Sequence, residues 1–458
     1  MATKPDEDRL EQNAELTVDG VTSDGRGVGR LQGLAVFVEG ALPGERVLAR
    51  ITGRKKNYAL ARTLRVLEAS PGRAEPSCPW YDVCGGCSLQ HADYQTELEI
   101  KRLILQQSLR RLAGQELEVP LPLPSPTPLH YRNRAVLHYD GTSLCFYNGR
   151  SHQPVPVTSC QLLRPELNDL LALVRDTLPA SGLPELRGAA LRCSADGQRL
   201  LLTFICHKRQ GRLSAVAEEL MRKQPKLISV WENDGPPVYS VYGERWRLLA
   251  GAEKLQDQIG PVAVDLSPAS FLQVNPGQTT ALYDLVRGFA GLDGSQRVLD
   301  LYSGVGSIAL YLAGSARQVW GVESYAPAAA DAADNAALNG ADNCRFETGR
   351  AEDILPRWAQ QGRRFDMAVL DPPRAGCDKR LLDAVARMAP PRLVCVSCAP
   401  ATLARDLAVL RSCGYAVEKL QPADMFPRTC HVETVCCLYH QKKDFISVPY
   451  EPNNVAYL

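Results

Sequence analysis

Short segments of alternating apolar and polar residues fill the first part of the chain. The apolar positions fall into four runs, at residues 16–18, 34–38, 46–51 and 61–66. Pairs such as Pro43-Gly44 separate the runs. A period of two is typical of strands that bury one face, and glycine or proline between such strands indicates tight turns. The pattern therefore predicts a small, OB-like antiparallel β-barrel over residues 10–73.

A different pattern follows the barrel. A helical repeat of apolar residues runs from residue 94 to 112, and alternating prolines between 119 and 128 then hold the chain extended. Beyond them, strand-like and helical runs are mixed, with strands at 135–139 and 200–205 and helices at 167–178 and 212–222. This mixture predicts a central α+β domain over residues 74–260.

Strands and helices alternate in the C-terminal part of the chain. Such alternation predicts a mostly parallel sheet that is covered by helices. We assign residues 261–440 to this Rossmann-like α/β domain and residues 441–458 to a tail of unknown role. The fold class is thus multidomain, with a barrel, an α+β domain and an α/β domain.

The charge of the chain is uneven along its length. The 458 residues have a formal net charge of +1, yet the segment from Arg26 to Arg73 contains ten basic and three acidic residues. An excess of positive charge on a barrel suits the phosphate backbone of a nucleic acid, although a solvated basic surface would have the same composition. No apolar run reaches the about 18 residues of a membrane span. We therefore expect neither a membrane span nor a secretion signal.

The chain contains 15 cysteines, and three of them lie within ten residues. Without a secretion signal, cysteines are expected to be reduced thiols, metal ligands or catalytic groups in a cytoplasmic protein. The close group is Cys78, Cys84 and Cys87, and Cys160 is a distant candidate for a fourth ligand. Glycines between these cysteines let the sulfurs turn inward. Zinc and an iron–sulfur cluster both fit this spacing, and unligated buried thiols are the alternative.

A glycine turn follows a predicted buried strand at residues 297–301. Gly304, Gly306 and Ala309 match the G-x-G-x-x-A pattern of nucleotide-binding loops, in which free backbone N–H groups face the ligand. Asp300 precedes the glycines and Glu323 ends the next strand, where a carboxylate can accept both ribose hydroxyls. These two acids favour S-adenosylmethionine as the ligand, although dehydrogenases use the same device. Either acid could instead be a capping or surface carboxylate.

Polar residues follow two further strands and begin a third. Asp371 follows the strand at 365–370, Cys398 follows the strand at 393–397, and Glu433 begins the last apolar strand. Carboxyl ends of parallel strands meet at one edge, so Asp371 and Cys398 are expected over the same crevice as Gly304. Cys395 and Cys398 also form C-x-x-C, a possible redox pair, but successive strand positions should direct Cys395 into the sheet. Glu433 could equally be structural.

These motifs together resemble the RNA uracil-5-methyltransferases, and the resemblance covers nearly the whole chain except the tail. Its most specific strings are Phe271-Leu272-Gln273-Val274-Asn275, Asp371-Pro372-Pro373-Arg374, Ser397-Cys398-Ala399-Pro400 and Asp424-Met425-Phe426-Pro427 before His431-Val432-Glu433. The barrel resembles a TRAM domain, and the cysteine group resembles an iron–sulfur site. Ala399 departs from the asparagine expected after the nucleophile.

The resemblance implies a reaction and a set of partners. A methyl group would pass from S-adenosylmethionine to carbon 5 of a uridine, with Cys398 as the nucleophile at carbon 6 and Glu433 as the base. Gln273, Tyr302, Gly304, Glu323 and Asp371 would line the donor pocket, and Asp371 would also bind the uracil edge. Cys78, Cys84, Cys87 and Cys160 would hold an iron–sulfur cluster of the 4Fe-4S type. We expect a monomer that acts on 23S rRNA or, alternatively, on tRNA.

Three other functions share some of these features. An iron–sulfur oxidoreductase could bind a nicotinamide or flavin at the Gly304 loop. A methylthio-transferase would combine a TRAM domain with clusters, but the cysteines lack the x3, x2 triplet of radical enzymes. An RNA-binding protein without catalysis is the third alternative. Methyl transfer to RNA would separate the predicted function from all three.

Overall fold

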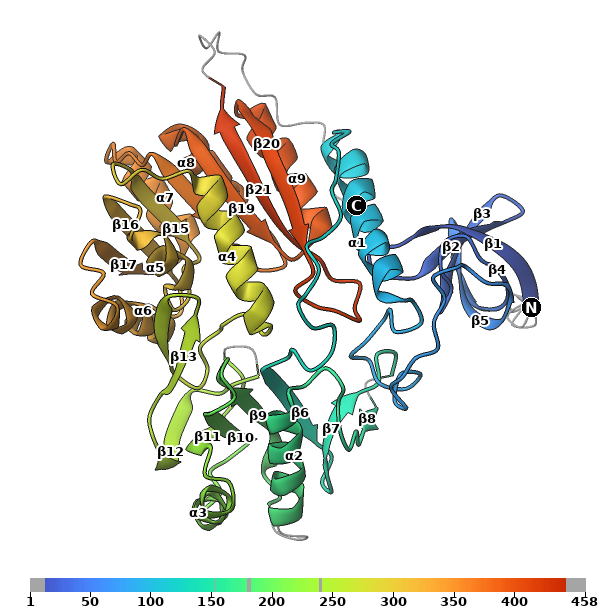
Figure 1. Cartoon of the computed structure of the whole chain (residues 1–458), viewed down its shortest axis with the longest axis horizontal. Coiled ribbons are helices and arrows are strands. Elements are labelled where there is room, and N and C mark those ends of the chain that lie inside the picture. Colours follow the sequence, from blue (N-terminus) through green and yellow to red (C-terminus); the bar gives the residue numbers. More distant parts are fainter. Residues whose placement is uncertain (1–12, 152, 179–182, 239–240, 442–458) are drawn as a thin grey trace, which may run out of the picture.

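The computed structural model describes residues 13–151, 153–178, 183–238 and 241–441. Within these ranges the chain forms a closed barrel, a seven-stranded middle sheet and a seven-stranded C-terminal sheet. Figure 1 shows the barrel to one side of α1, with the middle sheet below the C-terminal one. The multidomain fold class predicted from the sequence is confirmed, while the predicted tail at 441–458 lies almost entirely outside the described residues.

The barrel closes in the order β1-β2-β3-β5-β4. Its strands are β1 (Asn13–Val21), β2 (Gly27–Leu31), β3 (Leu34–Glu39), β4 (Arg46–Arg54) and β5 (Tyr58–Glu68). Alternate apolar side chains, such as Leu16 and Val18, point inward and form its core. Strand β2 is absent from the predicted apolar runs because it is rich in glycine. A Cβ atom on Gly29 would lie 2.8 Å from the Thr17 carbonyl oxygen, so this close approach of two strands requires glycine.

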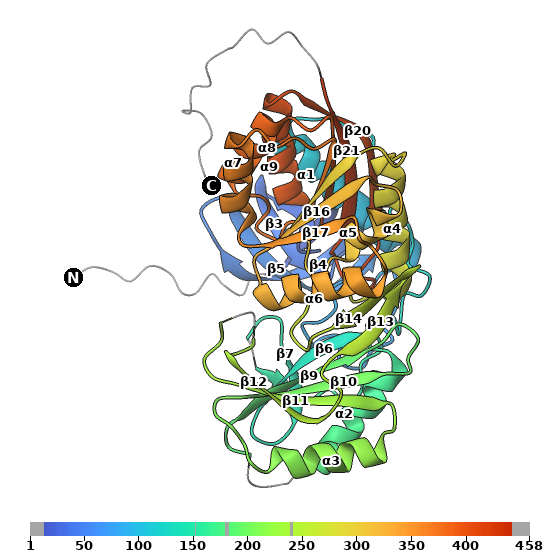
Figure 2. The ribbon, with the colours of Figure 1, turned by 90° about the vertical axis from the view of Figure 1, so that its left-hand side faces the viewer.

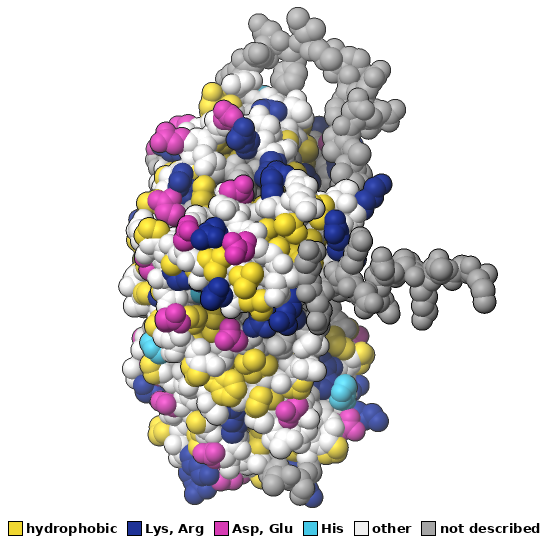
Figure 3. Space-filling model, turned by 90° about the vertical axis from the view of Figure 1, so that its right-hand side faces the viewer, with side chains coloured by type: hydrophobic (Ala, Val, Ile, Leu, Met, Phe, Trp, Pro, Cys, Tyr) yellow, Lys and Arg dark blue, Asp and Glu magenta, His cyan; other side chains and the backbone are white. Residues whose placement is uncertain are grey.

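Ion pairs balance part of the positive charge of the barrel. Arg46 lies 2.9 Å from Glu15 and 2.8 Å from Glu68, and Arg73 lies 3.0 Å from buried Glu45. The exposed face on this side of the molecule mixes basic, acidic and apolar side chains (Figure 3). The charge excess counted along the sequence therefore does not form one uninterrupted basic surface on this face.

The middle sheet has the order β12-β11-β10-β9-β6-β7-β8. Its strands are β6 (Arg134–Tyr139), β7 (Leu144–Tyr147), β8 (Pro154–Val155), β9 (Leu186–Cys193), β10 (Leu200–Cys206), β11 (Leu227–Asp234) and β12 (Arg245–Gly251). Helices α2 (Pro165–Thr177) and α3 (Leu213–Lys223) pack on one face, which Figure 2 shows turned away from the C-terminal sheet. The two predicted helices and both predicted strands of this region are present.

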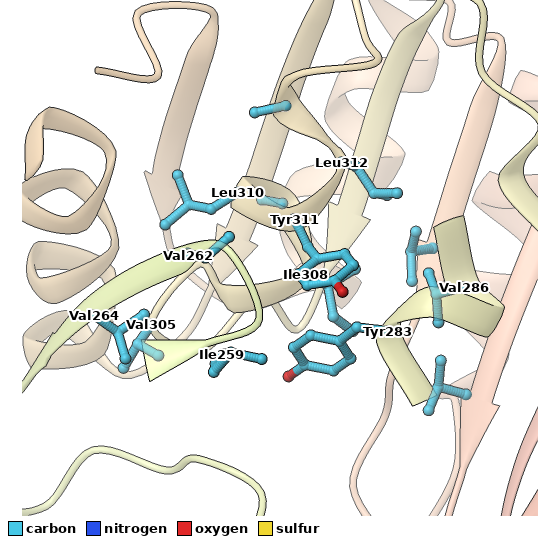
Figure 4. Close-up of a cluster of buried hydrophobic side chains, with 14 of the residues drawn as sticks. Ile259, Val262, Val264, Tyr283, Val286, Val305, Ile308, Leu310, Tyr311 and Leu312 are labelled. Atoms are coloured by element: carbon cyan, nitrogen blue, oxygen red, sulfur yellow. The ribbon is translucent and has the colours of Figure 1, made fainter. Parts of the chain in front are cut away.

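Two segments link the middle region to the C-terminal one. Helix α1 (Tyr94–Ser108) continues into a π-helical turn, η2 (Leu109–Ala113), and its apolar residues pack with Leu407 and Leu410 of α9 (Pro400–Ser412). A hairpin of β13 (Leu255–Ile259) and β14 (Val262–Leu266) packs against α4 (Pro276–Ala290) and α5 (Ser307–Ala313), as Figure 4 shows around Tyr283 and Tyr311. Both segments thus share apolar cores with the C-terminal sheet.

The C-terminal sheet has the order β17-β16-β15-β18-β19-β21-β20. Its strands are β15 (Arg297–Leu301), β16 (Gln318–Glu323), β17 (Cys344–Thr348), β18 (Met367–Leu370), β19 (Arg392–Ser397), β20 (Tyr415–Ala423) and β21 (Glu433–His440). The remaining helices are α6 (Ala326–Leu338), α7 (Ala351–Gln360) and α8 (Lys379–Met388). The five strands from β17 to β19 in this order run parallel, and β21 is antiparallel to both of its neighbours, β19 and β20. The strand order reverses between β15 and β18, which is where open α/β sheets bind ligands.

Candidate active site

The glycine turn after β15 forms the floor of a pocket. Tyr302, Gly304 and Gly306 all have positive φ angles, at 65°, 55° and 80°. Such angles are costly except for glycine, so Tyr302 is held in a strained conformation. The Gly304 N–H donates to the Glu323 carboxylate at 3.0 Å, and the same carboxylate accepts from the Tyr325 N–H at 2.7 Å. Glu323 therefore holds the loop from the end of β16.

The pocket above this turn has an empty volume of about 340 Å³, part of which is open to solvent. Four of the predicted donor-site residues line it, namely Gln273, Tyr302, Gly304 and Asp371. The predicted Glu323 is not among the lining residues. Four further residues line the pocket and were not predicted from the sequence, namely Phe271, Tyr283, Ser303 and Ser307. The position of Phe271, two residues before Gln273 in the same string, was the available sequence signal. In the structure Phe271 is 51% exposed, as suits a residue at the pocket mouth.

Asp300 brings a buried carboxyl group to the pocket. One oxygen, Oδ2, accepts from the Ala309 N–H at 3.0 Å, whereas Oδ1 has no hydrogen-bond partner among the described residues. Burial and the nearby Asp371 carboxylate raise the pKa of Asp300 well above its ordinary value. A buried polar atom without a hydrogen-bond partner is costly, so this oxygen is suited to form a hydrogen bond with a bound ligand.

The strand register places four predicted site residues side by side in two pairs. Leu370 pairs with Leu301 on one side and with Cys395 on the other, so Asp371 follows directly beside Tyr302. Ser397 of β19 pairs with Thr434 of β21. Because this pair is antiparallel, the next residue of β19 and the preceding residue of β21 are Cys398 and Glu433. The thiol and the carboxyl group thus meet at the edge of the sheet that also carries the glycine turn.

Burial and like charge control the proton affinities of this group. Glu433 is 2% exposed, and burial together with Asp371 raises its pKa well above the ordinary value. Burial also raises the pKa of Asp371 to about 7. The pKa of Cys398 is raised to about 11, first by burial and then by the Glu433 carboxylate. The resting site therefore holds a neutral thiol beside two carboxyl groups that bind protons more tightly than ordinary carboxyl groups do.

Arg374 is the cation that counteracts these shifts. It lowers the pKa of both Cys398 and Glu433. Arg405, on the helix that follows Cys398, instead donates to Asp406 at 2.7 Å and to the backbone oxygen of Ala375 at 3.0 Å. The cation that lowers the pKa of the thiol is thus the last residue of the Asp371-Pro372-Pro373-Arg374 string, in the loop after β18.

The remaining cysteines of this region are separate from the site. Cys395 is 7% exposed and belongs to an apolar core, whereas Cys398 is partly exposed. The expected divergence of the two side chains is present, which argues against a redox pair. Throughout the described ranges, which include all 15 cysteines, every thiol is free.

Hydrogen bonds bring three of the four predicted ligand cysteines, Cys78, Cys87 and Cys160, into one region. Ser77 and Gln161 exchange two hydrogen bonds, at 2.8 and 3.0 Å, which place Cys78 close to Cys160. Gln90 joins Cys78 to Cys87 by accepting from the Cys78 N–H at 3.2 Å and donating to the Cys87 sulfur at 3.3 Å. Among the residues that the structure describes, no group of three or more His, Cys, Asp or Glu side chains is placed to hold a single metal ion.

No helix of the described ranges is long and apolar enough to cross a membrane.

The site lies between the two large sheets. Asn275, at the start of α4, donates to Ser125 at 3.0 Å and to the Met425 carbonyl at 3.2 Å, and the Asn133 N–H donates to the Val274 carbonyl at 2.9 Å. The segment that carries Gln273 is therefore fastened by both neighbouring domains.

Comparison with known proteins agrees with this geometry. The sequence profile of the tRNA (uracil-5-)-methyltransferases matches residues 267–442, and that of the TRAM domain matches residues 11–64. A protein named uncharacterized RNA methyltransferase, from Halalkalibacterium halodurans, is 38% identical over 93% of this chain and 96% of its own. Another of that name, from Geobacter sulfurreducens, is 39% identical over 93% of this chain and 89% of its own.

A solved structure also matches over most of the chain. It is the Pyrococcus abyssi tRNA (uracil-54, C5)-methyltransferase in complex with S-adenosyl-L-homocysteine. The two chains are 27% identical and superpose with a TM-score of 0.72, over 93% of this chain and 100% of the other. The N-terminal barrel is thus a TRAM domain, and the C-terminal domain has a methyltransferase fold. The chain belongs to the S-adenosylmethionine-dependent RNA (uracil-5-)-methyltransferase family.

Proposed function

We propose that this protein methylates carbon 5 of a uridine in RNA through a transient covalent bond between Cys398 and carbon 6 of the base. The observation that supports this most directly is the β19–β21 register, which brings Cys398 and Glu433 side by side at the pocket edge. A nucleophile and a base within reach of one substrate ring are what this reaction needs.

The steps follow from the chemistry of uracil, whose carbon 5 is a poor nucleophile. The Cys398 sulfur adds to carbon 6, and the electron pair of the 5,6 double bond moves into an enolate. Carbon 5 of the enolate then takes the methyl group, for which bound S-adenosylmethionine supplies an electrophilic sulfonium methyl. Glu433 finally accepts the proton from carbon 5, the double bond re-forms, and the sulfur leaves.

The resting proton affinities set a condition on the first step. With its pKa near 11, Cys398 is a thiol at neutral pH, so it must lose its proton as the substrate binds or during the attack. Arg374 favours the thiolate. The raised pKa of Glu433 favours its protonated form, so Glu433 must lose this proton to solvent before the last step, in which it accepts the carbon 5 proton as a carboxylate. We infer that Asp371 binds the uracil edge and shares its proton with Cys398 and Glu433.

The donor pocket fits S-adenosylmethionine by its own unpaired groups. The free Oδ1 of Asp300 and the Ser303 hydroxyl are buried without partners among the described residues, and both flank the glycine turn. Gln273 and Tyr302 line the same space. We propose that these groups bind and orient the donor, while Glu323 acts on it through the Gly304 loop that it holds.

Replacement of Cys398 by alanine tests the covalent mechanism. We expect methyl transfer to RNA to be abolished, while binding of the same RNA, measured by gel shift, is retained because the barrel is untouched. Cys413→Ala, at the far end of α9, is the matched control and should leave both unchanged. Methylation by Cys398→Ala at the wild-type rate would contradict the proposed nucleophile.

The substrate uridine must leave any helical stack before a thiol can reach it. We propose 23S rRNA as the substrate, with tRNA as the alternative that the full-length match to the solved tRNA enzyme favours. Mapping 5-methyluridine in both RNAs, from cells with and without this gene, distinguishes the two. A missing methyl group in tRNA alone would overturn the assignment to 23S rRNA.

We infer that Cys78, Cys84, Cys87 and Cys160 hold a 4Fe-4S cluster, which would serve structure because methyl transfer moves no electrons. The Ser77–Gln161 and Gln90 hydrogen bonds support this by bringing Cys78, Cys87 and Cys160 together. Four cysteines suit a cluster, whereas a single zinc would need all sulfurs within roughly 2.3 Å of one point. Anaerobically purified protein should contain iron and sulfide in equal amounts, and Cys87→Ser should lose both. Zinc without sulfide would contradict the cluster.

A further inference from the structure

Lys101, on α1, is a fully buried cation that no proposed step uses. Its side chain has 0% exposure, and its ammonium group donates to Glu97 at 2.7 Å, to Asp424 at 2.5 Å and to the Phe426 carbonyl at 3.2 Å. All three N–H donors of the lysine are therefore satisfied. Burial of a charge is costly unless it is paired, so this arrangement needs both carboxylates.

Two of the three partners of Lys101, Asp424 and Phe426, lie in the loop that joins β20 to β21, residues 424–432. Asp424 also accepts from the Tyr94 hydroxyl at 2.9 Å, and the Arg428 N–H donates to Glu97 at 2.7 Å. The Arg428 carbonyl accepts from the backbone N–H groups of Ser88 and Leu89, at 3.0 and 3.1 Å. Figure 1 shows this loop against the N-terminal end of α1.

The same loop ends at Glu433. Ala423 and Glu433 are ladder partners in β20 and β21, so Asp424 begins the loop directly after the residue that pairs with the proposed base. Lys101 thus binds the loop next to the backbone that carries Glu433. Contacts from α1 and from residues 88–89 fix nine residues that would otherwise connect two strands freely.

We propose that Lys101 is a positioning residue for proton abstraction by Glu433. It touches no substrate atom in the proposed reaction. It acts by fixing the 424–432 loop, and this loop in turn fixes the position of the Glu433 carboxyl group at the pocket. This inference rests on the proposed function. It assigns Lys101 to the last step, in which the carbon 5 proton passes to Glu433 and the Cys398 sulfur leaves.

The test separates formation of the covalent adduct from its breakdown. The probe is RNA from cells that lack the gene, with tritium at carbon 5 of its uridines, incubated with a methyl-labelled donor. In Lys101→Met we expect adduct to form at the wild-type rate and to accumulate with its methyl group. Tritium release should fall by up to about 100-fold, since small misplacements of a base have effects of that size.

Two further variants keep the result decisive. Arg102→Met removes an exposed pair with Glu99 on the same helix and should behave as the wild type. Asp424→Asn retains the loop's shape and should show the pattern expected of Lys101→Met. It replaces Lys101→Met in the test if Lys101→Met does not fold. Equal slowing of both steps, or no slowing, would overturn the positioning role. A wild-type protein that forms no adduct at all would contradict the proposed function instead.

Discussion

Two buried groups of charged side chains flank the loop between β20 and β21, and they differ in their balance of charge. In the first, Lys101 lies between Glu97 and Asp424, and each acid is within 2.7 Å of the cation. In the second, burial and the Asp371 carboxylate raise the pKa of both Asp300 and Glu433. Paired charges fix a structure, whereas crowded acids hold protons that can be moved.

The comparison explains why the two groups are neighbours. Crowded acids repel one another once they ionise, so the elements that carry them must be held in place by other contacts. The Lys101 group supplies such contacts to the very loop that ends at Glu433. We therefore expect changes in the acid group to alter activity more than stability, and changes in the Lys101 group to alter stability at least as much as activity.

The largest effect should come from Glu433→Gln. Loss of a general base costs about 10²- to 10⁴-fold in rate, and the methylated adduct should accumulate on denaturing gels. The variant should also unfold at a higher temperature than the wild type at pH 8, because one of two facing buried carboxylates is gone. A lower melting temperature would contradict this, because it would mean that the Glu433 carboxylate stabilises the folded state through a partner.

A large loss of stability is expected for Lys101→Met. Removal of one partner from a buried ion pair costs about 3–5 kcal/mol. Asp424 loses the Lys101 ammonium, and Glu97 keeps only the more distant Arg428 guanidinium, at 3.7 Å. Urea denaturation should show this loss in the free energy of unfolding. Arg102→Met should change that free energy by no more than about 1 kcal/mol, since its pair with Glu99 is partly exposed. Similar losses in both would contradict the special place of Lys101.

The smallest effect is a pH dependence of stability from Asp371. Its folded pKa of about 7 lies above the ordinary 3.8, so the folded state binds the proton more tightly. The stabilising contribution is complete below about 3.8 and is lost as the pH rises through about 7. Asp371→Asn removes this dependence. Its melting temperature relative to the wild type should therefore rise between pH 5 and pH 8, and a constant difference would contradict the raised pKa.

Much of the site could be predicted from the sequence because its residues follow strands. Asp371 and Cys398 come directly after apolar runs, and parallel strands bring such positions to one edge. Gly304 lies in a turn that only a few residue types can form. These signals are local, so they survive without knowledge of the fold.

Other features depend on long-range packing and gave no local signal. Lys101 and Asp424 are 323 residues apart in the sequence, and a lysine in an amphipathic helix is ordinarily read as exposed. The choice of Arg374 over Arg405 depends on the direction in which one loop turns. Strand β2 was missed because its glycines, needed for close contact with β1, interrupt the apolar pattern.

Phe346, on β17, lies beneath the donor pocket without lining it. A Cβ atom on Gly306 would lie 2.9 Å from its ring, and one on Gly321 would clash with the same ring. One aromatic side chain thus limits the space at two glycines, one in a loop and one in the neighbouring strand. The three residues form an epistatic unit: a smaller side chain at position 346 would make alanine at 306 or 321 less costly sterically, so pocket redesign can begin at a residue that no ligand would meet.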